Sequence, residues 1–369
     1  MTNPIVQLAE IQDNIISEIE HAKQNIKTDG YPMSIGEIIN LYRDGDIILD
    51  PAFQRLYRWE DEQKTKLIES ILIGIPIPEI FVAQKADNTW HVVDGVQRLS
   101  TILQLAGVLD TYTPLTLQTC KYIPSLEGQS WKTLPIEIQR AFRRSKIKIS
   151  IILTQNSDEA QYELFQRLNT GGSALSPQEV RNCLMLMINP EFFDVINELK
   201  DYDNFKQCLQ LNEDDYKKEN HMELILRMFI GYENKVKYEE YGSLHSIIMG
   251  DFIDKETIRL MKNSDTEKFK DIFKRTFDKL KNCLADQSFH KYDIQKDRFK
   301  GGFNVSVFEM LTIGISSNIT QVEQLGNDLL IAKIKEIYVT NEIQTSFGRG
   351  VRAIKRFKDV TNFSKTYFE

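Results

Sequence analysis

The sequence predicts an α+β protein, with a mixed N-terminal domain at residues 1–187 followed by an all-helical domain at 188–369. Three observations support this prediction. Strand-like alternation and helical periodicity are interleaved over the first half of the chain, without a regular βαβ rhythm. After Met187 strand signals become rare and helical periodicity dominates. The length of 369 residues also suits two domains of typical size.

The first predicted elements are a helix, a turn, a second helix and a strand. Apolar residues recur at helical spacing over 5–19, so we expect an amphipathic helix whose polar tail ends in a turn at 27–30. Ser34 and Glu37 have the spacing of a capping box, which predicts that a short helix begins there. The apolar residues at 46–49 predict a strand.

Further elements complete the predicted N-terminal domain. A helix is expected at 60–73, where a buried apolar stripe is followed by glycine and proline. Two apolar segments, 80–82 and 90–93, flank a polar stretch and predict a hairpin. Alternating isoleucines predict a strand at 146–154, and a helix is expected at about 158–168.

The strand that ends the hairpin leads into the most informative motif of the chain. Asp94-Gly95 predicts a tight turn, and the apolar residues that follow predict a helix. Gln97 and Arg98 then lie in the first helical turn, where unpaired backbone N–H groups and the helix dipole favour an anion. Arginine adds a forked set of donors that suits phosphate oxygens. This arrangement predicts a phosphate site without a Walker loop, since no such motif occurs in the sequence.

Two interpretations of Asp94 remain open. A carboxylate beside a polyphosphate normally acts through Mg²⁺, which would make Asp94 a metal ligand and a catalytic residue together with Gln97 and Arg98. In the alternative, Asp94 only caps the helix by accepting hydrogen bonds from its first N–H groups. Gln97 would either orient an attacking water or hydrogen-bond a base.

A second motif, Gln54-Arg55-x-Tyr57-x-Trp59, lies between a predicted strand and a predicted helix. Its aromatic residues would be ordinary core residues in the simplest interpretation, with Arg55 paired to a surface acid. In the functional interpretation, Arg55 is a second phosphate contact or braces the turn after Asp94. Alternate residues of the motif share one face if the segment is extended.

A third motif contains a glycine pair between two predicted helices. Such a loop exposes backbone N–H groups that can surround an anion, although a helix end of the Schellman type explains the glycines equally well. A ligand-contact role is expected for Arg167, Asn169, Thr170 and Gly172. The next helix is predicted to begin at Ser176, which precedes a proline and a capping glutamate.

Taken in order, the three motifs resemble the GmrS-like N-terminal domain family of GmrSD-type, modification-dependent restriction systems, long catalogued as domain of unknown function 262. The usual family signature is Asp-Gly-Gln-Gln-Arg, and Val96 replaces its first glutamine. The resemblance implies a ParB/sulfiredoxin-like fold for residues 1–187 and a role in prokaryotic anti-phage defence on phage or modified DNA. The turn from Asp94 to Arg98 at a helix start predicts a nucleoside triphosphate with Mg²⁺ as the ligand. The nucleotide-binding residues expected from the motifs are Gln54, Arg55, Tyr57, Gly95, Arg167, Asn169, Thr170 and Gly172.

Three functions compete at this point. The leading hypothesis is a sensor or regulator that binds and hydrolyses a nucleoside triphosphate, with an effector nuclease as a partner and self-association as a further expectation. The second is a non-enzymatic, ParB-like DNA-binding module. The third, an intrinsic nuclease, is weaker because the five histidines form neither an HNH pattern nor a paired ligand spacing.

The net charge of −7 means that any contact with DNA must come from local basic patches. Two clusters are candidates, although charged faces are usually only solvated. The residues expected to contact DNA are Arg143 and Arg144 in the cluster at 140–148, and Arg349, Arg352, Lys355 and Arg356 near the C-terminus. The spacing of the second set would place its members along one side of a helix.

Composition also sets expectations about the compartment. The four cysteines are widely spaced without a C-x-x-C pair, which favours reduced thiols in a cytoplasmic protein. The N-terminus lacks a signal pattern, and no apolar run of roughly 18 residues could span a membrane.

Overall fold

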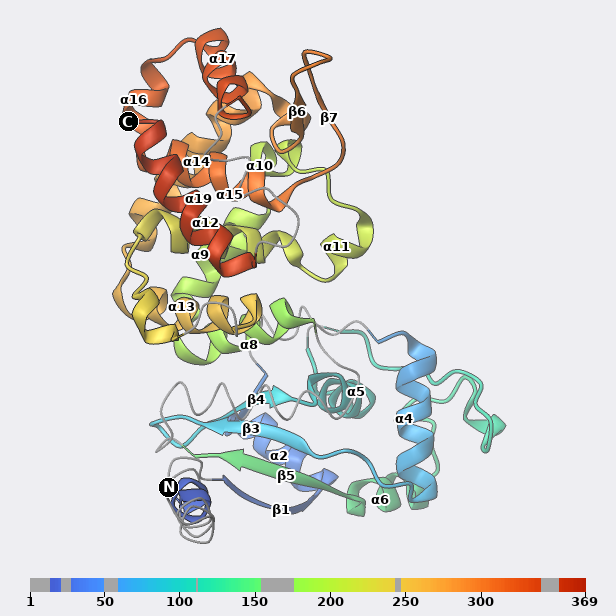
Figure 1. Cartoon of the computed structure of the whole chain (residues 1–369). Helices are drawn as coiled ribbons and strands as arrows, with labels where there is room; N and C mark the ends of the chain where they lie inside the picture. Colours follow the sequence, from blue (N-terminus) through green and yellow to red (C-terminus); the bar gives the residue numbers. More distant parts are fainter. Residues whose placement is uncertain are drawn as a thin grey trace, which may run out of the picture. The chain divides into compact units, whose positions relative to one another are not determined.

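The computed structural model of the protein describes residues 14–20, 28–49, 59–110, 112–153, 176–242, 247–339 and 352–369. The chain divides into two compact units, Met1–Ala174 and Leu175–Glu369 (Figure 1). A mixed sheet lies in the first unit and helices dominate the second, which confirms the predicted α+β class. The predicted boundary at 187 falls near the end of α8 (Pro177–Ile188), a helix that the contacts group with the second unit.

The first unit is built on a five-stranded sheet with the order β1-β5-β3-β4-β2. Its strands are β1 (Thr28–Ser34), β2 (Ile47–Ile48), β3 (Ile80–Gln84), β4 (Trp90–Asp94) and β5 (Lys146–Ile152). β1 pairs antiparallel with β5, β5 parallel with β3, β3 antiparallel with β4, and β4 parallel with β2. The predicted strands at 46–49 and 146–154 and the predicted hairpin are thereby confirmed.

Four helices pack with this sheet and with one another: α2 (Ile35–Asp44), α4 (Asp61–Ile73), α5 (Val96–Ala106) and α6 (Ile136–Arg144). A short 3₁₀ helix spans Pro124–Leu126. Ser34 caps α2 as predicted, because its hydroxyl accepts the N–H of Glu37 at 3.2 Å. Within the predicted helix at 5–19, the described residues from 14 onward are helical.

One prediction for this unit is wrong. The segment 27–30 was expected to form a turn, but Thr28–Gly30 begins strand β1. Gly30 lies opposite Ser150 on β5, and a Cβ atom at position 30 would be 2.7 Å from the carbonyl oxygen of Ile149. Here glycine permits the close approach of two backbones, so pairing with a distant strand overrides its local tendency to form turns.

The second unit consists mainly of helices. They are α8, α9 (Pro190–Lys200), α10 (Asp203–Cys208), α11 (Glu213–Lys217), α12 (Asn220–Glu233), α13 (Met249–Asn263), α14 (Thr266–Cys283), α15 (Val305–Ser317), α16 (Ile319–Gln324), α17 (Asn327–Ile337) and α19 (Ala353–Tyr367). The prediction of an all-helical domain needs one correction, because a hairpin of β6 (Lys291–Asp293) and β7 (Arg298–Lys300) interrupts the helices. Among the described residues, none of the helices is both long and apolar enough to cross a membrane.

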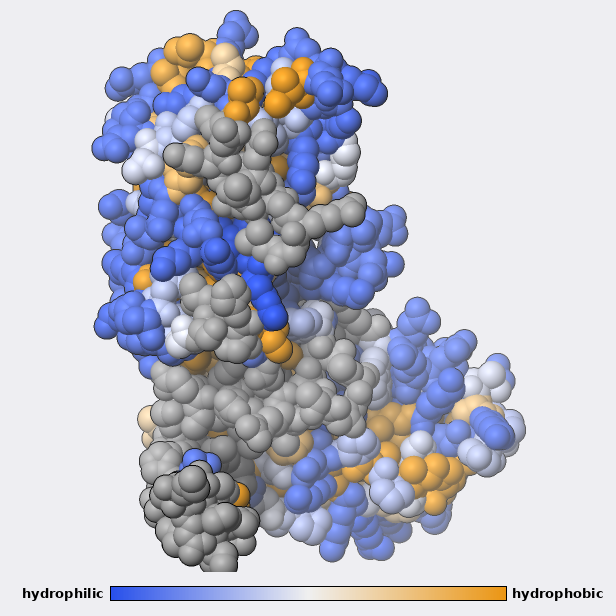
Figure 2. Space-filling model, viewed as in Figure 1, coloured by the Kyte–Doolittle hydropathy of each residue, from blue (hydrophilic) through white to orange (hydrophobic). Residues whose placement is uncertain are grey.

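Aromatic side chains fill the core of this second unit. Phe229 stacks on Phe269 with ring centroids 3.7 Å apart, and Phe205 contacts Phe273 and Phe277 edge-on. All five rings are buried. The surface is different in character, since Figure 2 shows mostly hydrophilic residues with hydrophobic residues in small, separate patches.

A chain of charged residues, four of them buried, also runs through the second unit. It alternates carboxylates with arginines in the order Asp254, Arg181, Glu223, Arg227, Glu309 and Arg356. Arg181 Nε lies 2.5 Å from Asp254 Oδ1, and its Nη1 lies 2.7 Å from Glu223 Oε2. Arg227 joins Glu223 to Glu309 at 2.8 and 2.6 Å. These ion pairs connect α13, α8, α12, α15 and α19.

Candidate functional site

The centre of the candidate site is the turn between β4 and α5. Asp94 ends β4, Gly95 lies in the left-handed region at φ 89°, and α5 begins at the next residue. Gln97 and Arg98 therefore lie in the first turn of α5, as predicted. A Cβ atom at position 95 would be 2.9 Å from Cγ1 of Ile80, so both backbone conformation and packing require glycine here.

A β-bulge precedes this turn. In the pairing of β3 with β4, Phe81 lies opposite Asp94 but Val82 lies opposite Val92, which leaves Val93 as an extra residue. Bulges bend a strand and redirect the side chains beside them. The bulge therefore helps to set the direction of the Asp94 side chain at the end of β4.

Arg98 braces the turn from the helix side. Its Nη2 donates to Asp94 Oδ2 at 2.9 Å and to the carbonyl oxygen of Glu79 at 3.0 Å. The N-cap residue of α5 is Gly95, and the Asp94 carboxylate contacts the Arg98 guanidinium. The Arg98 and Asp94 side chains are 15% and 30% exposed, and Arg98 Nε is buried without a hydrogen-bond partner among the described residues.

Gln97 connects the first two motifs. Its Oε1 accepts a hydrogen bond from the backbone N–H of Trp59 at 3.2 Å, across 38 positions of sequence. Trp59 is the last residue of the Gln54–Trp59 motif, so the end of that motif lies against the first turn of α5. The other predicted site residues of the motif, Gln54, Arg55 and Tyr57, lie outside the described residues.

A second group of polar residues adjoins the turn and was not predicted. Glu79 Oε2 accepts a hydrogen bond from Ser150 Oγ at 2.6 Å and pairs with Lys148 Nζ at 2.7 Å. Burial acts to raise the pKa of Glu79, but the hydrogen bonds from Lys148 and Ser150 outweigh it and hold the pKa below its ordinary value. Glu79 thus connects β5 to Arg98, through its carboxylate on one side and its carbonyl on the other.

The charges at this turn suit a metal–phosphate ligand more than a protein-only metal site. Among the described residues, no group of three or more His, Cys, Asp or Glu side chains gathers as a metal ion would require. Mg²⁺ usually takes one or two carboxylates and completes its shell with phosphate oxygens and water. Asp94, partly exposed and engaged through Oδ2 alone in the described contacts, fits that mode of binding.

The glycine loop of the third motif lies outside the described residues, and with it Arg167, Asn169, Thr170 and Gly172. The helix predicted to follow it is confirmed as α8. Ser176 Oγ accepts the N–H of Glu179 at 3.2 Å, and Glu179 Oε2 accepts the N–H of Ser176 at 2.7 Å, which completes a capping box.

Sequence reasoning missed the buried polar residues of α8. Gln178, Arg181 and Asn182 are 1–2% exposed. Their signal in the sequence is an arginine and two amides within a mainly apolar helix. Gln178 bonds to Arg181 and Asn182 on the same helix. The carboxylates that pair with Arg181 and Asn182 are 37 to 73 positions away, so the sequence alone does not identify them.

The two predicted basic clusters differ in the structure. In the cluster on α6 and the start of β5, Arg140, Arg143, Arg144 and Lys146 are exposed, and no ion pair joins them to any described residue. We call these four residues the α6–β5 basic surface. Lys148 is close by in sequence but is paired with Glu79.

The C-terminal cluster is smaller than its spacing predicts. Arg352 and Lys355 are exposed at the start of α19. Arg356 instead lies 3.4 Å from the buried carboxylate of Glu309 and is 18% exposed. Arg349 lies outside the described residues. The cluster therefore presents two exposed cations in the described part of the chain.

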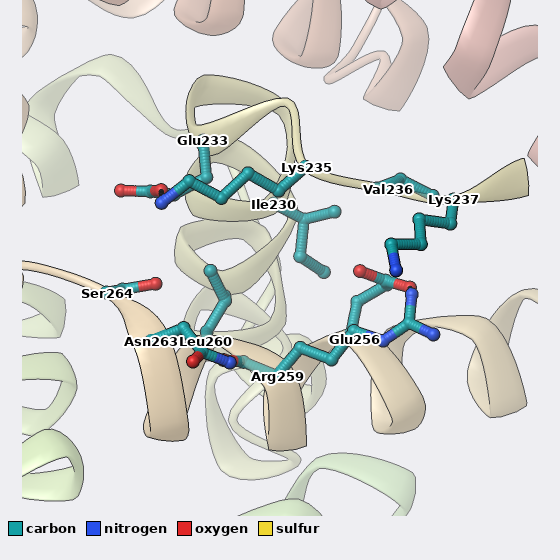
Figure 3. Close-up of a pocket in the computed structure, with 10 residues that line it drawn as sticks. All are labelled: Ile230, Glu233, Lys235, Val236, Lys237, Glu256, Arg259, Leu260, Asn263 and Ser264. Atoms are coloured by element: carbon teal, nitrogen blue, oxygen red, sulfur yellow. Dashed lines mark hydrogen bonds and ion pairs between the residues drawn. The ribbon is translucent and has the colours of Figure 1, made fainter.

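A cavity of about 400 Å³ lies in the second unit between the end of α12 and α13 (Figure 3). Ile230 and Leu260 contribute apolar surface to it. Its cations already have partners: Lys235 pairs with Glu233, Lys237 with Glu240, and Arg259 with Glu240 and Glu256. The cavity is also lined by the C-terminal ends of α12 and α13, where the helix dipole disfavours an anion, so it is a weaker candidate for phosphate than the start of α5.

Comparison with known protein families finds a match, which covers the segment that contains this turn. Residues 35–186 match the family described as the GmrSD restriction endonuclease, N-terminal domain. The match confirms, for this segment, the resemblance carried by the three motifs. Comparisons with curated proteins and with solved structures found no match.

Proposed function

We propose that this chain, in which residues 35–186 form a GmrSD-type N-terminal domain, binds and hydrolyses a nucleoside triphosphate with Mg²⁺. In this proposal it is a regulatory component of a restriction system that acts on DNA. The observation that carries the proposal is the β4–α5 turn, where Asp94, Gly95, Gln97 and Arg98 surround the start of a helix.

The start of α5 has the features of a phosphate site. Its N-cap residue is Gly95, which has no side chain to cap the helix, and the helix dipole favours an anion in front of the turn. Arg98 is held by Asp94 and by the carbonyl of Glu79, which fixes a cation at this position before any ligand arrives. Such preorganisation reduces the entropic cost of binding.

The catalytic roles follow from the same positions. A bound Mg²⁺ would supply charge neutralisation on the phosphate oxygens, with Asp94 as its protein ligand. Gln97, whose side chain is oriented by the Trp59 N–H, would position the attacking water. Gln54, Arg55, Tyr57, Arg167, Asn169, Thr170 and Gly172 remain proposed nucleotide contacts from the motifs.

Calorimetric titration with each nucleoside triphosphate tests the binding site. Arg98→Ala should weaken binding by about 1.5–3 kcal/mol, roughly 10- to 150-fold in Kd, because a charge-assisted hydrogen bond is lost. Arg275→Ala removes an exposed arginine of the second unit and serves as the control. If folded Arg98→Ala retains wild-type affinity, Arg98 is not part of the site.

Phosphate release tests the chemistry. Asp94→Asn keeps an oxygen for Arg98 and should bind nucleotide but lose turnover. The assay uses each nucleotide with Mg²⁺, with and without DNA. If the wild-type protein releases no phosphate under any of these conditions, hydrolysis is refuted and the non-enzymatic, ParB-like DNA-binding module becomes the better description.

The α6–β5 basic surface favours a DNA contact in either case, because exposed cations that pair with none of the described carboxylates suit backbone phosphates. Arg143→Glu/Arg144→Glu should weaken DNA binding and lower its salt dependence by about 0.9 per lost phosphate contact. Arg352→Glu/Lys355→Glu makes the same charge change at the C-terminal cluster. If only this second variant loses affinity, the contact lies there instead. Because the histidines form no HNH pattern, we also propose that cleavage depends on a separate nuclease.

A further inference from the structure

The β6–β7 hairpin is an unusual feature of the second unit. It interrupts a helical region, and Figure 1 shows it extending away from the neighbouring helices. Its ten residues, 291–300, contain four cations and two carboxylates, on a chain with a net charge of −7. The hairpin is thus a local positive region on an acidic protein.

One face of the hairpin attaches it to the unit. Tyr292 and Phe299 are cross-strand partners with ring centroids 5.3 Å apart, and Tyr292 also contacts Tyr338 at the end of α17. Lys335 of α17 lies 5.1 Å above the Tyr292 ring and pairs with Asp297 at 2.7 Å. The hairpin therefore has a defined orientation, with its aromatic face towards the helices.

Alternation along the strands places the charged residues on the other face. Lys291 lies directly opposite Lys300, and Asp293 lies opposite Arg298. Lys300 also forms an ion pair with Asp293. This face of the hairpin therefore carries three cations and one carboxylate.

The loop between the strands adds the groups that a groove-binding element uses. Ile294 is 51% exposed, and Gln295 and Lys296 are exposed beside it. Lys296 and Arg298 form no ion pair with any described residue. An amide can pair with the edge of adenine and an apolar side chain can contact the methyl group of thymine, while cations contact phosphates.

We infer that the β6–β7 hairpin inserts into the major groove of duplex DNA, with Ile294 and Gln295 against base edges and Lys296 and Arg298 against phosphates. The major groove, about 12 Å wide, accepts a two-stranded ribbon. This inference rests on the DNA-directed role proposed above, and it adds a contact separate from the α6–β5 basic surface.

Fluorescence anisotropy with a labelled duplex tests the inference on the full chain. Lys296→Glu/Arg298→Glu should weaken binding at least tenfold and lower the slope of log K against log salt by about 2, because two phosphate contacts are lost. Lys262→Glu/Lys268→Glu makes the same charge change on exposed residues of α13 and α14 and should change affinity less than twofold. Methyl green, which occupies the major groove, should displace the protein, whereas netropsin in the minor groove should not.

The outcomes separate this inference from the proposed function. If the wild-type protein binds duplex DNA and the hairpin variant binds equally well, the hairpin contact is refuted and the DNA role stands. The same conclusion follows if the hairpin variant and the control variant lose the same amount of affinity. Displacement by netropsin alone refutes the groove assignment. If the wild-type protein binds no duplex at any salt concentration or nucleotide state, the DNA role itself fails. If the hairpin variant unfolds at the same temperature as the wild-type protein, its loss of binding is not caused by loss of the fold.

Discussion

Replacing Arg181 by methionine tests the chain of charged residues most directly. The Arg181 side chain is 1% exposed and contacts two carboxylates, Asp254 at 2.5 Å and Glu223 at 2.7 Å. Methionine preserves much of the volume but leaves both carboxylates without this partner. Removing one member of a buried pair costs about 3–5 kcal/mol, since the remaining charge stays desolvated. We expect a loss of about 4 kcal/mol, which lowers Tm by about 10 °C for a unit of roughly 200 residues.

Arg275→Met is the matched control. Arg275 also contacts two carboxylates, Glu323 at 2.6 Å and Asp271 at 3.2 Å, but its side chain is 34% exposed. Exposed ion pairs contribute about 0–1 kcal/mol, because water already solvates both partners. Urea titration followed by circular dichroism gives the free energy of unfolding of both variants.

Equal losses in the two variants would refute the argument that burial decides the cost. A second comparison tests the mechanism. Arg181→Met/Asp254→Leu removes the carboxyl most deeply buried beside Arg181, whose pKa burial raises to about 8. It should recover more than 1 kcal/mol relative to Arg181→Met, because an unpaired buried polar group is gone. If the double variant is less stable than the single one, the cost of Arg181→Met arises from packing and not from the unpaired buried group.

Two further predictions concern Gly95 and His221. Gly95→Ala should lower the free energy of unfolding by about 2–4 kcal/mol, because position 95 combines a left-handed backbone with contact to Ile80. Gly107→Ala is the control, since Gly107 has φ 67° but no neighbouring atom within 4 Å of an added Cβ. It should cost only about 1 kcal/mol in the same urea titrations. Burial lowers the pKa of His221 to about 4. Because an unfolded histidine binds its proton near pH 6.5, stability should fall as pH falls from 6.5 to 4, by at most about 3 kcal/mol. In His221→Gln, the free energy of unfolding measured across this pH range should no longer show this decrease.

Local chemistry was the part of the fold that could be predicted. The caps at Ser34 and Ser176 and the turn at Asp94-Gly95 depend on residues within four positions of one another, and the structure contains all three. The first turn of α5, with Gln97 and Arg98, follows from the same local pattern. The resemblance then identified a family that the match over residues 35–186 confirms.

Distant pairings explain what was missed. β1 forms because Gly30 allows its strand to approach β5, more than 100 positions away, and no local signal indicates that pairing. Glu79 accepts a hydrogen bond from Arg98 through its carbonyl, and its carboxylate is held by Ser150, 71 positions away. The spacing of Arg356 predicts an exposed residue, but its guanidinium pairs with Glu309. The burial of Glu309 depends on the packing of α15 against α19.

The position of α8 limits how this domain can be exchanged between proteins in evolution. The family segment ends within this helix, yet Arg181 on it finds its carboxylates on α13 and α12 of the second unit. A gene fusion that joined residues 35–186 to an unrelated sequence would carry a cation that needs burial without its counter-charges. The new C-terminal partner would have to supply acidic residues at matching positions. A fusion made at residue 186 is therefore expected to be less stable than one made between Ala174 and Leu175, which leaves α8 with its own carboxylates.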